Sequence, residues 1–206
     1  MIGLLRYAFL RGLRDGSLIT LLAAPTVMVS MPAVAVWLSG RTVPMPPAEA
    51  AGGLIVFNAA LMGSLASFMA FRSEIATRAI GAFVLASRSW LIPFACTIYG
   101  WIVGTTAATL CAGAMFATGW GAPADLRSVT VNVLVIGLAA ASAGTLGVMI
   151  SSSFSTMAWV FAGLVGMIGL IQANEAASGI EILAVLLVVL ISSGIAAVIV
   201  ERRCAT

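Results

Sequence analysis

The stretch FRSEIATRAIGAFVLASRSW, Phe71–Trp90, separates two long apolar segments and carries four charged side chains. Because the whole chain holds only ten basic and seven acidic residues, these four are a marked concentration of charge. The stretch is suited to a helix and is longer than the roughly 2–8 residues that join neighbouring helices in a bundle. We therefore predict a helical segment outside a membrane, between two spans, that contacts another structural element or a partner.

The composition around this stretch predicts an all-α integral membrane protein. Of 206 residues, 62% are hydrophobic and 8% are charged, whereas a soluble domain has about 25% charged residues. The charges leave apolar runs of roughly 20 residues, the length that crosses a hydrocarbon core. No polar stretch is long enough to fold alone, so residues 1–206 are expected to form one transmembrane domain.

Six apolar segments are expected to span the membrane. Pro25 and Pro32 predict a kink in the first, because each removes a helical hydrogen bond. In the third, Gly100 and Gly104 begin a row of small residues that favours close helix packing. The short turn Ser151–Ser155 predicts an antiparallel hairpin of the fourth and fifth. The six segments are Leu18–Leu38, Ala51–Ala70, Leu91–Thr118, Val129–Ile150, Thr156–Gln172 and Ile180–Val200.

The N-terminal segment Met1–Gly16 is amphipathic at helical spacing. We predict an interfacial helix, with its apolar side in the acyl region and its arginines toward lipid phosphates. A signal peptide is the alternative, but the following apolar run is too long for one and equally hydrophobic segments follow. The apolar face holds Ile2, Leu5, Phe9 and Leu13, the opposite face Tyr7, Arg11 and Arg14, and the interfacial arginines are Arg6, Arg11 and Arg14.

The distribution of arginine predicts the orientation. With six spans, both termini lie on one side, and the cytoplasmic side is the one richer in basic residues. Only Arg41 and Arg127 fall on the other side. Both termini and Phe71–Trp90 are therefore expected in the cytoplasm. The arginines on this side are Arg6, Arg11, Arg14, Arg72, Arg78, Arg88, Arg202 and Arg203.

No constellation typical of an enzyme or a metal site is present in the sequence. The chain lacks histidine, the usual general base and metal ligand, and its three cysteines form no CxxC pair. It has no Gly-rich phosphate loop ending in GK[ST]. No carboxylate lies at the middle of a predicted span, which disfavours an ion-coupled carrier. We expect neither catalysis nor nucleic-acid binding, since the net charge of +3 reflects arginine-rich cytoplasmic segments.

Two stretches give the chain a resemblance to the membrane subunit of ABC-2 type ABC transporters. Arg6–Val29 is similar to that family's amphipathic entry helix, with Arg14 and Asp15 before a proline-containing span. Ser73–Trp90 is similar to the family's coupling helix, which docks on the ATPase, although Ala76 stands where glycine is usual. The matching residues are Glu74, Thr77, Leu85 and Arg88.

The resemblance implies a permease in a bacterial cytoplasmic (inner) membrane. It implies a second permease subunit, identical or homologous, and two ATPase subunits that bind ATP and Mg, so this chain would hold no cofactor. An amphipathic or apolar cargo is expected, such as a lipid, a peptide or a drug-like molecule. The coupling residues would be Arg72, Glu74, Thr77, Arg78, Leu85 and Arg88, with Glu74 and Arg78 as an i, i+4 pair; the substrate-pathway residues would be Asn58, Met62, Phe68, Trp159, Phe161 and Met167.

Two other functions agree with six spans in this length. One is a substrate-capture protein for vitamin uptake, similar to the S-component of energy-coupling-factor transporters, which would dock through its small-residue helices. Such a protein does not need an arginine-rich segment after its second span, so the exporter is favoured. The other is a membrane scaffold that transports nothing.

Overall fold

A computed structural model describes residues 1–40, 48–76, 81, 83, 88–119, 125–150 and 178–205. Every regular element in this part of the chain is an α-helix. Four helices are long and apolar enough to cross a membrane, at Ala51–Ala70, Leu91–Thr118, Leu126–Ile150 and Gly179–Arg202, and a shorter apolar helical stretch covers Ser17–Met31. The prediction of an α-helical membrane protein is thereby confirmed for the described residues.

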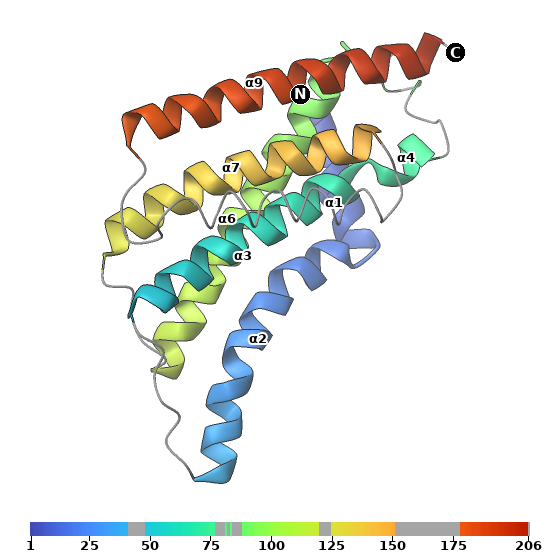
Figure 1. Cartoon of the computed structure of the whole chain (residues 1–206). Coiled ribbons are helices and arrows are strands. Elements are labelled where there is room, and N and C mark those ends of the chain that lie inside the picture. Colours follow the sequence, from blue (N-terminus) through green and yellow to red (C-terminus); the bar gives the residue numbers. More distant parts are fainter. Residues whose placement is uncertain are drawn as a thin grey trace.

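The helices follow the predicted segments closely (Figure 1). The predicted first, second, third, fourth and sixth spans correspond to α2, α3, α6, α7 and α9, whereas the fifth, at 156–172, lies outside the described residues. Helix α2 continues through both prolines, and Figure 1 shows that it bends along its length. The bounds are α1 Ile2–Arg14, α2 Ser17–Ser39, α3 Ala48–Ala70, α4 Arg72–Ala76, α6 Leu91–Thr118, α7 Leu126–Ile150 and α9 Gly179–Ala205.

Helix α3 is central and packs along both α6 and α7. The approach is close because glycines stand where the helices cross. A Cβ atom on Gly104 of α6 would lie 2.4 Å from the backbone oxygen of Ala59, and one on Gly144 of α7 would lie 2.3 Å from that of Ser64. We call these four residues the α3 crossing. The small residues predicted to allow close packing in the third span therefore do so against α3.

Several polar side chains buried among these three helices have hydrogen-bond partners within the bundle, whereas the buried hydroxyl of Ser64 has none. The amide of Asn58 donates to the Leu54 carbonyl oxygen at 2.9 Å, and the Thr97 hydroxyl donates to the Thr145 hydroxyl at 3.0 Å. The Ser67 hydroxyl donates to the carbonyl oxygen of Cys96 at 3.1 Å. Such bonds offset the cost of removing polar groups from water.

Helix α9 lies against α7 at the edge of the bundle and runs in the same direction (Figure 1). Within the described chain, 28% of its apolar span is buried, against 67% for α3 and α7. Its outer face carries large aliphatic side chains such as Leu190, which is 69% exposed. In a membrane this face can contact lipid or another transmembrane helix.

Candidate functional site

The N-terminal helix α1 is held against the bundle by a face of small and aliphatic residues. Leu4, Ala8 and Gly12 are buried. Gly12 allows a close contact with α6, because a Cβ atom there would lie 2.6 Å from the hydroxyl oxygen of Tyr99. The ring of Phe9 meets that of Tyr99 edge-on, with 4.8 Å between the centroids. These packing contacts hold helix α1 against α6 independently of any polar contact.

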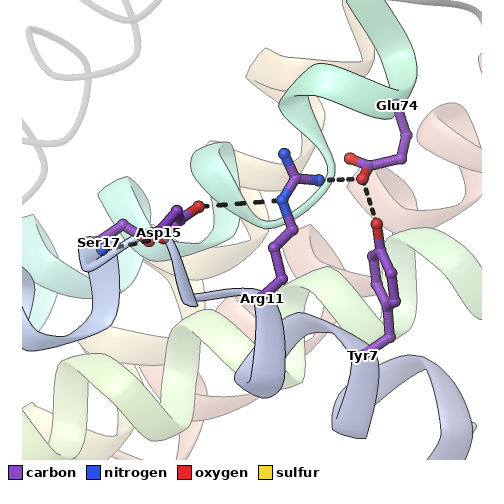
Figure 2. Close-up of polar contacts among 5 residues, drawn as sticks. All are labelled: Tyr7, Arg11, Asp15, Ser17 and Glu74. Carbon is purple, nitrogen blue, oxygen red and sulfur yellow. Dashed lines mark hydrogen bonds and ion pairs between the residues drawn. The ribbon is translucent and has the colours of Figure 1, made fainter. Parts of the chain in front are cut away.

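A sharp turn connects α1 to α2 and sets the direction of the N-terminal helix. Gly16 has φ of 76°, a left-handed conformation that suits glycine. The Asp15 carboxylate accepts a hydrogen bond of 2.9 Å from the backbone N–H of Ser17, the first residue of α2 (Figure 2). The turn thus supplies one of the partners that an unpaired helix N-terminus needs.

Opposite this turn, α1 and α4 meet through a buried carboxylate. Glu74 of α4 accepts hydrogen bonds from the Tyr7 hydroxyl and from Nη1 of Arg11 (Figure 2). Arg11 Nε also lies 3.9 Å from a carboxylate oxygen of Asp15. Glu74 is only 7% exposed, and more than sixty residues separate it from both partners in the sequence. The cluster therefore ties the N-terminal helix to the segment that follows α3.

Aromatic rings surround this ion pair. The ring centroid of Tyr7 lies 5.7 Å from that of Phe71 and 5.1 Å from that of Phe83, and the two phenylalanines are 5.5 Å apart. Phe71 is fully buried. Apolar surroundings lower the local dielectric constant and strengthen charge-assisted bonds. We call these five residues, Tyr7, Arg11, Phe71, Glu74 and Phe83, the α1–α4 junction.

The electrostatics of the junction favour the ionised pair. Burial alone would raise the pKa of Glu74, but the hydrogen bonds from Tyr7 and Arg11 outweigh it and lower the pKa below the usual 4.5. Burial would likewise lower the pKa of Arg11, and the contact with Glu74 raises it. The pKa of Tyr7 is raised by burial and by its bond to the carboxylate. The carboxylate therefore stays charged, with two donors, at neutral pH.

The predicted coupling residues occupy different environments. Glu74 is buried in the junction, and Arg72 is half-buried with its guanidinium 5.7 Å from the ring centroid of Phe68. Arg88 is exposed. Thr77, Arg78 and Leu85 lie outside the described residues, so the predicted pair of Glu74 with Arg78 stays a prediction.

A helix, α1, is present where the interfacial helix is predicted, and its three arginines differ in their surroundings. Arg6 and Arg14 are exposed, whereas Arg11 turns toward Glu74. The expectation that all three arginines point to lipid phosphates is therefore wrong for Arg11, because a buried carboxylate is the nearer anion. Of the predicted apolar face, Ile2 and Leu13 are 80% and 51% exposed, whereas Leu5 and Phe9 are half-buried and pack against the bundle.

The sequence interpretation missed the contact between α1 and α4. Tyr7 and Arg11 stand four residues apart on one face of a helix, and Glu74 is the single acidic residue of Phe71–Trp90. Both segments were predicted on the same side of the membrane. The single carboxylate of Phe71–Trp90, together with two donors on one face of the N-terminal helix, was the signal that could have indicated the pairing.

The predicted pathway residues of α3 lie inside the bundle. Asn58, Met62 and Phe68 are 6%, 5% and 1% exposed. Asn58 reaches Sγ of Cys111 at 3.5 Å in addition to its backbone bond, so it faces α6. Trp159, Phe161 and Met167, predicted for the fifth span, lie outside the described residues.

Within the described ranges, no group of three or more His, Cys, Asp or Glu side chains is arranged to hold a metal ion. The architecture defines the chain as an α-helical membrane protein with an N-terminal helix packed across the ends of its spans. Comparisons with protein-family models, curated proteins and solved structures found no match.

Proposed function

We propose that this chain is the transmembrane permease subunit of an ATP-driven ABC-2 type exporter that moves an amphipathic or apolar substrate out of the cytoplasm. The α1–α4 junction carries the proposal. The two segments assigned to the cytoplasmic side, Met1–Gly16 and Phe71–Trp90, are joined through Glu74, Tyr7 and Arg11. A segment that receives force from an ATPase needs such a firm attachment to the helices it moves.

The directions of the helices support six spans with both termini on one side of the membrane, and the arginine distribution favours the cytoplasm for that side. Helices α2 and α6 run one way and α3, α7 and α9 run the other (Figure 1). Two consecutive described spans, α7 and α9, thus share a direction, which requires the chain to return between them. The apolar segment 156–172 would supply that return as the fifth span, in a bacterial cytoplasmic membrane.

Force applied to the coupling segment would reach three helices. Phe71 joins α4 directly to α3. The pair of Glu74 with Arg11 carries the displacement to α1, and the contact of Gly12 with Tyr99 carries it to α6. Closure of two ATPase subunits on ATP and Mg would then shift the permease pair between two packings.

With the pathway residues of α3 buried, the described conformation would be a closed state of the transporter. Asn58 and Phe68 would line a path only after α3 moves relative to its neighbours, because both are now packed within the chain. Trp159, Phe161 and Met167 would face the same path from the fifth span. The second permease subunit, identical or homologous, would supply the other wall.

The experiment uses an exposed residue, because changing buried Glu74 would also disturb the fold. We expect Arg88→Glu to reduce co-purification with an ATPase encoded beside this chain, and ATPase stimulation, by about tenfold, the scale of several exposed charge contacts. Arg127→Glu is the matched control, since Arg127 is exposed and precedes the predicted external end of the fourth span. If neither variant alters association, or both alter it equally, the coupling assignment fails.

A further inference from the structure

A hollow of about 510 Å³ lies along the side of α1 next to the junction, lined by Tyr7, Leu10, Arg11, Arg14 and Asp15. This volume is within the range of small-ligand sites. The lining is distinct from the packed face of α1, because none of its residues is among those buried against the bundle. Tyr7 and Arg11 of this lining also belong to the α1–α4 junction, so the hollow lies directly beside the junction.

The hollow is lined by two cations, Arg11 and Arg14, and by the carboxylate of Asp15, and its exposed cation is Arg14. Arg11 is already matched, because its guanidinium contacts both Glu74 and Asp15. Arg14 is exposed, and among the residues described here no ion pair involves it. A guanidinium presents several donors in a planar fork that suits phosphate oxygens. The site is thus suited to an anion that approaches from the surface.

An apolar wall continues from this charge. Leu10 lines the hollow and is 56% exposed, and Leu13 beside it is 51% exposed. Exposed leucines gain nothing from a free phosphate ion, but they bury apolar area against an acyl chain. One available guanidinium next to an apolar wall, on an interfacial helix, favours a ligand that carries both an anionic phosphate and an apolar chain.

We propose that this hollow binds an anionic phospholipid, with Arg14 contacting the phosphate and Leu10 the start of an acyl chain. The proposal does not rest on the exporter function, since it requires only that α1 lies at the membrane interface. Because Arg11 lines the hollow and also holds Glu74, a bound lipid contacts the same helix face as the junction. Lipid composition would then influence how firmly α1 is attached.

Native mass spectrometry of the full chain in detergent tests the proposal, with dioleoylphosphatidylglycerol and dioleoylphosphatidylcholine as the two probes. We expect wild-type protein to retain phosphatidylglycerol preferentially, and Arg14→Gln to lose about fivefold in its affinity, the effect of one interfacial arginine. Arg127→Gln, which also removes an exposed arginine, is expected to bind like wild type. Leu10→Asn is expected to weaken both lipids.

Three results would overturn the proposal. Equal retention of both lipids would mean that the hollow binds acyl chains without selecting the charge of the headgroup. Unchanged phosphatidylglycerol binding by Arg14→Gln would place the lipid elsewhere. Equal competition by glycerol phosphate, which lacks acyl chains, would mean that the hollow takes a soluble phosphate. Circular dichroism of each variant checks that helix content is preserved.

Discussion

The α1–α4 junction and the α3 crossing both hold helices together, but with different chemistry. At the crossing, Gly104 and Gly144 bring backbone against backbone and no side chain lies between the helices. At the junction, the contact consists of a carboxylate, its two donors and three aromatic rings. The helices approach closely at the crossing because its glycines have no Cβ atom, whereas the junction is held by the charged carboxylate of Glu74.

This difference indicates where the molecule can change. The crossing is a close backbone contact, so α3 is expected to move relative to α6 and α7 only after the junction has changed. The junction can exchange partners, because a carboxylate and a guanidinium each accept other counter-charges. A conformational change driven from outside the bundle should therefore begin at the junction.

The largest expected effect comes from filling the crossing. Gly144→Ala places a methyl group 2.3 Å from the backbone oxygen of Ser64, where only backbone could move aside. We expect a loss of about 3 kcal/mol or more in the free energy of unfolding, at the upper end for overpacked sites. Reversible unfolding in sodium dodecyl sulfate, followed by circular dichroism, measures it.

Gly113→Ala is the matched control for this prediction. Gly113 lies in α6, and a Cβ atom there meets nothing within 4 Å. The control is expected to be neutral or to stabilise the helix by up to about 1 kcal/mol. Equal stability of the two variants would show that the crossing is not closely packed.

The next effect is at the junction. Glu74→Gln removes the anion that Arg11 and Tyr7 share and leaves Arg11 only the Asp15 carboxylate at 3.9 Å, so we expect a loss of about 2 kcal/mol, the range for hydrogen bonds to a charged group. Tyr7→Phe keeps the ring contacts and removes one donor, so about 1 kcal/mol is expected. Glu201→Gln is the control, since Glu201 is exposed and bonded to Ser89. If Glu201→Gln lowers the free energy of unfolding as much as Glu74→Gln does, the junction has no special role in stability.

The smallest effect is a dependence on pH. The pKa of Glu74 lies below its usual 4.5 in the folded chain, so its stabilising contribution is present above pH 4.5 and is lost as pH falls through the folded pKa. Hydrogen–deuterium exchange of α1, corrected for the intrinsic rate, should therefore show lower protection below pH 4.5 than at pH 6.

The same measurement on Glu74→Gln separates Glu74 from its neighbours. Burial would raise the pKa of Asp15, but hydrogen bonds from Ser17 and the charge of Arg11 lower it, so Asp15 titrates in the same acidic range. If the variant loses protection as steeply as wild type, the pH dependence belongs to Asp15 and not to the junction.

The sequence by itself determined the helices. The third span was predicted as Leu91–Thr118 and found with those bounds, because apolar length and the charged or glycine residues at each end are local properties. The amphipathic character of Met1–Gly16 could also be predicted from the sequence, since a helix repeats its faces every 3.6 residues. The small residues Gly100 and Gly104 of the third span stand four apart on one helix face, and this spacing indicated close packing.

Only the tertiary structure decided which residues meet. Local spacing offered Arg78, which lies outside the described residues, as a partner of Glu74, and the fold brings Tyr7 and Arg11 to Glu74 across more than sixty residues. The predicted pathway residue Asn58 faces α6, because the rotation of α3 is set by where glycines let its neighbours approach. Spacing along a chain specifies the faces of one helix, but contact between faces depends on how all the helices pack.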